Sequence, residues 1–289
     1  EEESYLISKS LVKLAEKTQA KTLRFWGKIF GTQADYYVAE GRVSDEFADD
    51  VPDKTYEPAG QGVNRMTYWV TNSVLEDWKQ LPLISPKQVE AARSIKHYFT
   101  GNLNEKLMTY PAFPGLEKHY LKAQIARITH STELAPKGLY KLNDEKEDDP
   151  ELYFEEEYKY PAWEEVANPE SWVHMHQILL KAGRVTHLKP EAVNPDDDPE
   201  DLLQKLQEND PTVDRLRDIG QDLFEPEKED QGDEPAKAWI TRTYGETQVY
   251  NTLARPGVDE EQTSFAVVAH KSTVWPGACL VASAEKHVN

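Results

Sequence analysis

Cysteine is almost absent from this sequence of 289 residues, because Cys279 is the only one. A single cysteine excludes an internal disulfide framework and a cysteine-rich zinc site. Cys279 lies in an apolar segment with no base nearby in the sequence. We therefore expect it to be a small buried hydrophobe in a strand and not a reactive nucleophile.

The chain also lacks a signal peptide and any apolar run of about 18 residues, the length that a membrane span needs. We therefore expect a soluble intracellular protein. Basic residues are few beside the acidic ones, with 33 Lys and Arg against 52 Asp and Glu and a net charge of -19. Such a chain repels phosphate backbones and anionic membranes, so we expect neither as a main partner, whereas basic protein surfaces are favoured.

The common catalytic motifs are missing as well. The sequence has no phosphate-binding loop, no Gly-X-Ser-X-Gly elbow and no His-Glu-X-X-His zinc helix. On a strand, His174 and His176 would point to the same side and could reach one ion, but no further ligands are indicated, so ordinary histidines are expected. We predict no catalytic, metal-binding or cofactor-binding residues.

An enzyme remains an alternative, in the form of a hydrolase that uses two carboxylates. With 52 acids in the chain, a close pair of carboxyl groups carries little information about acid–base catalysis. A hydrolase would also need a deep pocket that holds convergent titratable groups with perturbed pKa values.

The N-terminal part of the chain predicts a helix followed by strands. Apolar residues at three- and four-residue spacing predict an amphipathic helix over Glu3–Thr18. Such a helix is marginal alone, so we take residues 1–20 as a segment that docks or dimerises. Aromatic and β-branched runs predict a hairpin with arms Leu23–Phe30 and Asp35–Val43, and a further strand over Val63–Thr71.

The middle of the chain predicts a second helix and a proline-rich loop. Ser85 is a candidate N-cap with Pro86 at the first helical position, and we expect this helix to end at Gly101. The prolines of Tyr110–Gly115 predict an extended loop. Over Tyr120–Ile128 the apolar pattern fits a strand and a helix, and we favour the strand.

Acidic runs interrupt the second half of the chain. Asp144–Glu157, Pro195–Asp201 and Glu225–Glu234 predict solvated loops, as acidic insertions at about 143–160 and 194–235. Short helices could form over Leu202–Leu206 and Val213–Ile219. The strands expected near the end are Ala238–Tyr244, Phe265–His270 and Ala278–Ala282, with a turn at Trp275–Gly277.

Together these patterns predict the α+β class. We expect β-rich antiparallel sheets with a few helices, an N-terminal amphipathic helix and long acidic loops. Residues 21–289 would form one domain with its acidic insertions.

Aromatic residues are unusually frequent, with 7 Trp and 14 Tyr in a polar chain. Packing of a β-rich core explains many of them, but tryptophan and tyrosine also dominate protein interfaces. We selected as interface candidates the aromatic residues of the predicted strands and turns together with three leucines of the first helix. They are Leu6, Leu11, Leu14, Phe25, Trp26, Phe30, Tyr36, Tyr37, Trp69, Trp172 and Trp275.

Seven blocks of sequence, in this order, resemble the radial spoke head 4/6 family. The most specific block is the hairpin Arg24–Gly31 with its continuation Asp35–Gly41. The other blocks are Gly62–Asn64 with Tyr68–Val70, Tyr98–Leu103, Tyr110–Gly115, Tyr120–Ile128, Ser171–His174 with His176, and Trp275–Ala278. The family's sequence continues beyond the last block, and its acidic insertions vary. A shorter related spoke head subunit shares the hairpin type, so the paralogue stays open.

This resemblance implies a non-catalytic structural subunit of the radial spoke head, a part of the axoneme of motile cilia and flagella, and so a cytoskeletal location. Its partners would be other spoke head subunits, as a homodimer or heterodimer of paralogues, and transiently the projections of the central pair. It would pass mechanical signals between the central pair and the dynein arms. The acidic loops could charge an outer face that makes brief, salt-sensitive contacts, or could merely keep the chain soluble. An acidic interaction adaptor unrelated to cilia is the remaining alternative.

Overall fold

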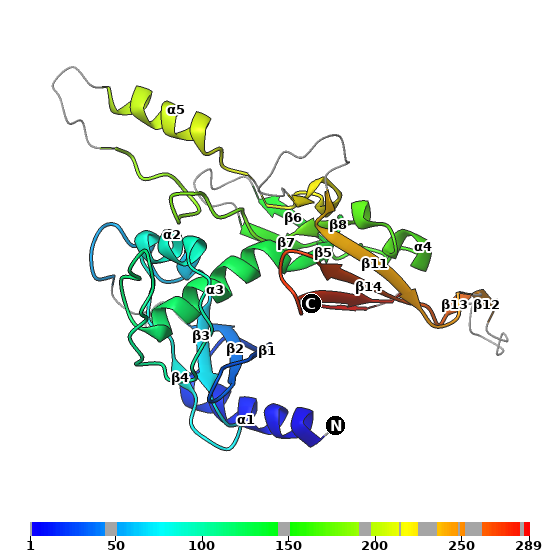
Figure 1. The fold of residues 1–289 in the computed structure, drawn as a ribbon. Coiled ribbons are helices and arrows are strands. Elements are labelled where there is room, and N and C mark those ends of the chain that lie inside the picture. Colours follow the sequence, from blue (N-terminus) through cyan, green and yellow to red (C-terminus); the bar gives the residue numbers. More distant parts are fainter. Residues whose placement is uncertain are drawn as a thin grey trace. The chain divides into compact units, whose positions relative to one another are not determined.

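The computed structural model describes residues 2–43, 51–143, 151–190, 198–213, 215–224, 236–247, 249–251, 262–283 and 286–289 (Figure 1). The chain divides into two compact units. Unit 1 comprises Glu1–Arg127 and Leu179–Thr212, and unit 2 comprises Ile128–Ile178 and Val213–Asn289. The mixture of helices and antiparallel strands confirms the predicted α+β class.

Unit 1 is built on a four-stranded antiparallel sheet with the order β1-β2-β3-β4. Its strands are β1 (Thr22–Ile29), β2 (Tyr36–Arg42), β3 (Thr67–Thr71) and β4 (Lys79–Gln80), and its helices are α1 (Glu2–Thr18), α2 (Pro86–Ser94), α5 (Pro199–Asn209) and most of α3 (Glu117–Thr132). The predicted hairpin is confirmed, because β1 pairs with β2 from Thr22↔Arg42 to Ile29↔Tyr36, with a bulge at Trp26.

The sheet of unit 1 is covered on both faces. Leu14 of α1 packs with Trp69 against one face, where the Trp78 indole also donates a hydrogen bond to Ser10 Oγ at 2.6 Å. On the other face, Leu121 and Ile125 of α3 pack with the alternate residues of β2 and β3. Successive side chains of a strand point to opposite faces of the sheet. Since both faces are covered, most residues of β2 and β3 are buried, whichever face they point to.

Two predicted elements of unit 1 are shorter than expected. α2 begins with the predicted cap, a capping box between Ser85 and Gln88, but it ends at Ser94 and not at Gly101. The reason is tertiary: the Tyr120 hydroxyl bonds the Ile95 carbonyl and the His97 amide, both at 3.3 Å, and so holds an extended segment there. The strand predicted over Val63–Thr71 begins only at Thr67.

The residues before β3 form a 3-10 turn, η2 (Gly62–Asn64), and not a strand. The Asn64 side chain fixes this turn, because its amide donates to the carbonyls of Glu57 and Ile84 at 2.8 and 3.0 Å. Its oxygen accepts from the Ile84 amide at 3.0 Å. These polar contacts are made across the fold, so the alternating apolar pattern alone could not reveal them.

The strand favoured over Tyr120–Ile128 is wrong, because this segment lies inside helix α3. Leu121, Ala123, Ile125 and Ala126 are all buried. A helix that is covered on several sides has no clear polar stripe, so its apolar residues can alternate by chance as in a strand.

Unit 2 contains a second four-stranded sheet with the order β11-β14-β15-β16. These strands are β11 (Trp239–Tyr244), β14 (Val267–Ser272), β15 (Cys279–Ala282) and β16 (His287–Val288). The three strands predicted near the end of the chain are confirmed, as is the turn, where the Ala278 amide bonds the Trp275 carbonyl at 3.0 Å. Trp172 and Val268 belong to the core of this unit.

Two-stranded pairs and short helices complete unit 2. The pairs are β5 (Leu134–Pro136) with β8 (Trp172–His174), β6 (Tyr140–Asn143) with β7 (Glu151–Phe154), β9 (Leu223–Phe224) with β10 (Ala236–Lys237), and β12 (Val249–Asn251) with β13 (Gln262–Ser264). The short helices are α4 (Trp163–Val166), η3 (Pro169–Ser171) and η4 (Ile219–Gln221).

Some predictions for unit 2 are wrong. Cys279 is exposed, because Leu280 and Ala282 face the core on β15 and Cys279 therefore points outward. Where the segment Val213–Ile219 is described, it is not helical before Ile219, the first residue of η4, because the Leu216 amide and the Arg217 carbonyl bond the backbone of His174.

The acidic runs are only partly within the described residues. Residues 151–154 form β7, so the solvated loop predicted there is wrong. The reason is that β6 supplies backbone partners for this strand, which the acidic composition could not indicate. Residues 144–150, 195–197 and 225–234 lie outside the described part. The short helix predicted at Leu202–Leu206 is confirmed as α5, which Asp198 caps through the Glu200 amide at 2.9 Å. Because α5 begins at Pro199, the loop predicted over Pro195–Asp201 is wrong for residues 199–201.

Candidate interaction surface

A buried carboxylate organises one end of the sheet in unit 1. Glu117 begins α3 and is completely buried. It accepts hydrogen bonds from the Tyr36 hydroxyl at 2.8 Å, from the Thr100 amide and hydroxyl at 3.0 and 2.8 Å, and from the Gly101 amide at 3.0 Å. Burial, and then the hydrogen bond to Glu117, raise the pKa of Tyr36 well above its usual range. Tyr36 therefore stays protonated and donates.

Glu117 fixes the loop at Thr100 and Gly101. This loop also binds the turn of the β1–β2 hairpin. The amides of Thr32 and Gln33 donate to the carbonyls of Phe99 and Thr100 at 2.8 and 3.1 Å. The Asn72 side chain, just after β3, donates to the carbonyls of Asp35 and Gly101 at 3.0 and 3.2 Å. Three segments far apart in the sequence are thus fixed to one another by hydrogen bonds.

These three segments carry large apolar side chains that face water. We call Phe30, Leu75 and Tyr98 the exposed trio, because 76%, 81% and 84% of their surfaces are accessible. Gly31 and Phe99 form a parallel bridge, so Phe30 and Tyr98, each one residue earlier, are neighbours. One exposed apolar residue is ordinary, but three on segments that are rigidly held together are typical of a protein-binding surface.

The start of α1 is tied to the hairpin by polar contacts. The Tyr37 hydroxyl donates to Glu3 at 2.6 Å, and the Lys28 ammonium lies 3.3 Å from the same carboxylate and 3.4 Å from Asp35. The Tyr37 and Lys28 hydrogen bonds lower the pKa of Glu3. Since α1 also packs on the sheet through Leu14, it is part of unit 1; its docking to another protein stays a prediction.

The structure separates the predicted interface candidates into three groups. Leu14, Tyr36, Trp69 and Trp172 are buried, so the chain's own core already occupies their side chains. Phe30 is exposed. The half-buried candidates are Leu6, Leu11, Phe25, Trp26, Tyr37 and Trp275. Leu75 and Tyr98 were missed, although Tyr98 directly precedes Phe99, which packs against the core.

The two histidines of the candidate metal pair contact different carboxylates. His174 Nε2 lies 2.7 Å from Asp222, whereas His176 Nε2 contacts Glu133, so each imidazole has its own carboxylate. Burial alone would raise the pKa of Asp222, but the hydrogen bond from His174 and the contacts with Trp239 and Arg217 hold it below its usual value. Within the described ranges, no three His, Cys, Asp or Glu side chains converge as a metal ion would require.

Acidification is expected to destabilise unit 2 through His270. This side chain is fully buried, with Nε2 donating to the Val166 carbonyl at 2.9 Å and Nδ1 bonded to Thr241 Oγ1 at 2.8 Å. Burial lowers its pKa below the ordinary value of 6.5, so the unfolded chain takes up a proton first as the pH falls through 6.5. Stability should be complete above pH 6.5 and decline below it.

Denaturant unfolding of the full chain at pH 7 and pH 5, followed by a signal from unit 2, would measure this effect. The variant His270→Gln should be less stable at pH 7, but should lose less stability between the two pH values than the wild type. An unchanged pH dependence in His270→Gln would contradict the assignment.

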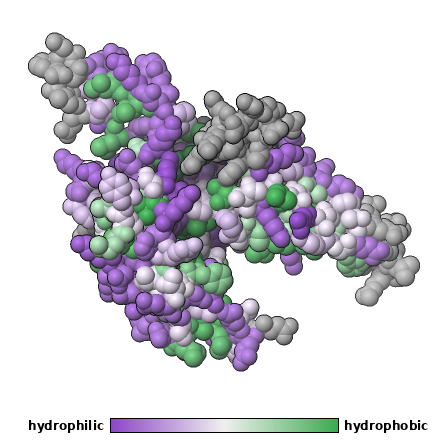
Figure 2. Space-filling view, viewed as in Figure 1, coloured by the Kyte–Doolittle hydropathy of each residue, from purple (hydrophilic) through white to green (hydrophobic). Residues whose placement is uncertain are grey.

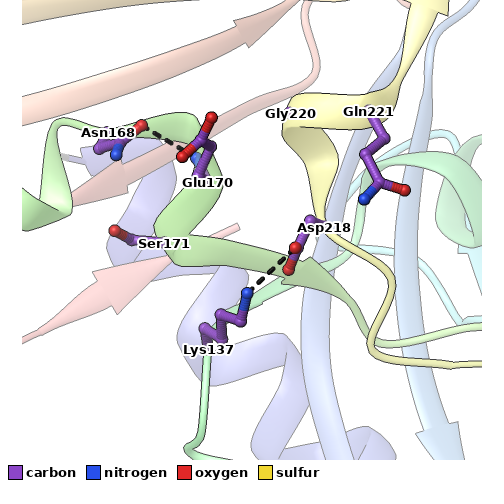
Figure 3. A pocket seen from close by; sticks show the side chains of 7 residues that line it. All are labelled: Lys137, Asn168, Glu170, Ser171, Asp218, Gly220 and Gln221. Atoms are coloured by element: carbon purple, nitrogen blue, oxygen red, sulfur yellow. Dashed lines mark hydrogen bonds and ion pairs between the residues drawn. The ribbon is translucent and has the colours of Figure 1, made fainter.

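A polar pocket of about 470 Å³ lies in unit 2 (Figure 3). Lys137 points across it to Asp218, with Nζ 3.0 Å from the carboxylate, and Asn168 accepts a hydrogen bond from the Glu170 amide at 3.1 Å. The residues that line the pocket include two carboxylates, Glu170 and Asp218, and one hydroxyl, that of Ser171. Of the two carboxyl groups that line the pocket, that of Asp218 is therefore paired with the Lys137 ammonium.

Comparison with known proteins places the chain in context. The family model described as "Radial spokehead-like protein" matches residues 1–57 and 48–289. Radial spoke head protein 6 homolog A of Mus musculus is 30% identical over 339 residues, covering 100% of this chain and 46% of the relative. Flagellar radial spoke protein 4 of Chlamydomonas reinhardtii is 33% identical over 281 residues, covering 91% and 55%.

Radial spoke head protein 4 homolog A of Homo sapiens is similar at 28% identity over 331 residues, covering 100% of this chain and 44% of the relative. The chain thus spans about half the length of the curated relatives it matches. None of the helices in the described part combines the length and the apolar character needed to cross a bilayer.

Proposed function

The chain belongs to the radial spokehead-like family, and we propose on this premise that it is a non-catalytic structural subunit of the radial spoke head. Radial spoke head proteins are components of the ciliary and flagellar axoneme, and the chain is assigned to that structure. The observation that carries the proposal is the match of the family model to residues 1–57 and 48–289. It is supported by 28–33% identity to radial spoke proteins over 91–100% of this chain.

The geometry of unit 1 supports a role in assembly. Its buried polar groups, such as Glu117, are used to hold loops in place, and the result is a rigid surface with exposed aromatic side chains. Preorganised aromatic residues lose little conformational freedom on binding, which is the property of interface anchors. We propose that the exposed trio contacts another spoke head subunit.

Two finer roles follow as proposals from the family. As a spoke head subunit, the chain would pair with a paralogue or a second copy of itself, and would meet projections of the central pair transiently. Through those contacts it would pass mechanical signals to the dynein arms and so control motility. The net charge of -19 supports brief, screened contacts over adhesion to acidic surfaces.

Removal of the trio's aromatic side chains is expected to weaken incorporation into spokes. Purified full chain would be added to axonemes from cells that lack it, and the bound fraction measured against concentration. The double variant Phe30→Ala with Tyr98→Ala should bind at least about tenfold more weakly, because each buried aromatic anchor contributes about 1–2 kcal/mol or more. Both side chains are exposed, so the fold should be unaffected.

A matched control removes one phenylalanine and one tyrosine elsewhere. Tyr244 and Phe265 in unit 2 are exposed by 47% and 63%, and their double alanine variant should bind like the wild type. If the variant Phe30→Ala with Tyr98→Ala bound as tightly as the wild type, the exposed trio would not be part of the interface. Absence of wild-type binding would contradict the spoke head role itself.

A further inference from the structure

Helix α5 presents an apolar stripe that the described chain covers only in part, since Leu202 and Leu203 are half-buried. Leu202, Leu203 and Leu206 lie on one side of the helix, following the spacing of a helical turn, yet no residue of α5 is buried. Leu206 is 44% exposed. In Figure 2, apolar atoms run along α5 beside hydrophilic ones.

The helix is well defined locally even though it lacks core contacts. Asp198 caps its first turn, Pro199 occupies N1, and Asp210 anchors its last turn, since the Asp210 carboxylate accepts from the Ala182 amide at 3.3 Å. The His187 ring also bonds the Asp210 carbonyl at 2.7 Å. Isolated helices shorter than about 12–15 residues are marginal in water, so these 11 residues need a surface for their leucine stripe.

The charges around the stripe define what that surface can be. Asp198, Glu200, Asp201, Glu208 and Asp210 are acidic, and Lys205 is the only basic residue of the helix. A second α5, an anionic membrane, or another acidic stretch of this chain would meet like charge. The favoured occupant is therefore basic at its edges.

We propose that α5 is a docking helix that inserts Leu202, Leu203 and Leu206 into an apolar groove bordered by Lys and Arg on a different protein of the spoke. The binding mode is that of an amphipathic helix in a groove, in which apolar anchors supply affinity and rim charges orient the partner. The assignment of the groove to a spoke component rests on the proposed function. The leucine stripe of α5 and the acidic residues around it do not depend on that function.

The test uses full chain and axonemes from cells that lack it. The variant Leu202→Ala with Leu206→Ala keeps strong helix formers and the net charge, and is expected to bind at least about tenfold more weakly, the effect of losing two buried leucines. The control Gln204→Ala with Gln207→Ala changes two neutral residues of the same helix off the leucine stripe and should bind like the wild type. Circular dichroism should show both variants folded.

A photo-crosslinker at position 206 identifies the occupant. Leu206→p-benzoylphenylalanine is expected to crosslink to another spoke polypeptide, at a peptide that contains apolar and basic residues. Crosslinking only within this chain or to a second copy would overturn the proposal. Binding by the variant Leu202→Ala with Leu206→Ala that equals the binding of the wild type would overturn it as well. If the wild type does not bind axonemes at all, the proposed function fails, and with it the spoke partner.

Discussion

Replacing Glu117 by alanine is expected to lower the stability of the unit 1 sheet by about 3–5 kcal/mol, since it leaves several buried donors without an acceptor. The lost bonds are those from the Tyr36 hydroxyl, the Thr100 amide and hydroxyl, and the Gly101 amide, all between 2.8 and 3.0 Å. Because domains are stable by about 5–15 kcal/mol, this change would bring much of unit 1 close to unfolding.

Hydrogen exchange of the amides in β2 and β3 would report this loss directly. Glu117→Gln should have a smaller effect, because the amide keeps one acceptor oxygen while its NH₂ faces donors. The control is Glu105→Ala, whose exposed side chain makes one hydrogen bond with Asn102 at 3.2 Å and should change stability by less than about 0.5 kcal/mol. If the amides of β2 and β3 were equally protected from exchange in Glu117→Ala and Glu105→Ala, the hydrogen bonds of Glu117 would not stabilise the sheet.

Replacing Gly101 by alanine is the second change with a large expected effect, about 2–4 kcal/mol, from backbone strain and steric clash together. Gly101 has a φ of +97°, which side chains rarely adopt. An added Cβ would lie 2.5 Å from the Ala34 carbonyl oxygen and 2.8 Å from its nitrogen. The hairpin turn and the 98–102 loop would have to separate, which would also displace Phe30 from Tyr98.

Gly60→Ala separates strain from clash. Gly60 also has a positive φ, +82°, but an added Cβ would meet nothing within 4 Å. Its substitution should cost only the strain, about 1 kcal/mol. Denaturant midpoints of the two variants and the wild type would give the comparison. If Gly60→Ala were as destabilising as Gly101→Ala, the close approach of Ala34 would not be the cause.

The elements predicted correctly are those with local signals. The β1–β2 hairpin has aromatic arms around a short turn, and the start of α2 has a Ser85 cap with Pro86, so neighbouring residues specify both. The end of α2 and the nature of α3 depend on packing. Tyr120 holds Ile95 in an extended segment, and α3 is covered on several sides, which removes its helical pattern.

The candidate surface could be predicted only in part. Phe30, Tyr36 and Trp69 were all selected as interface candidates because they are aromatic. Phe30 is exposed, whereas Tyr36 and Trp69 are buried, and composition alone cannot distinguish the two cases. Glu117 was invisible in the sequence, since it is one carboxylate among 52 acids and its partner Tyr36 lies 81 positions away. A buried carboxylate can be identified only from the hydrogen-bond donors around it, and the fold alone brings those donors together.

The order in which the chain builds its two units has a mechanical consequence. The chain passes from unit 1 to unit 2 after Arg127, returns after Ile178 and passes again after Thr212, so three covalent connections join the units. The first runs inside α3, a continuous helix. Force can therefore pass from one unit to the other along three covalent connections, one of them inside a helix. A chain shortened from one end so that it keeps all of one unit also keeps part of the other, so neither unit can be produced alone in this way.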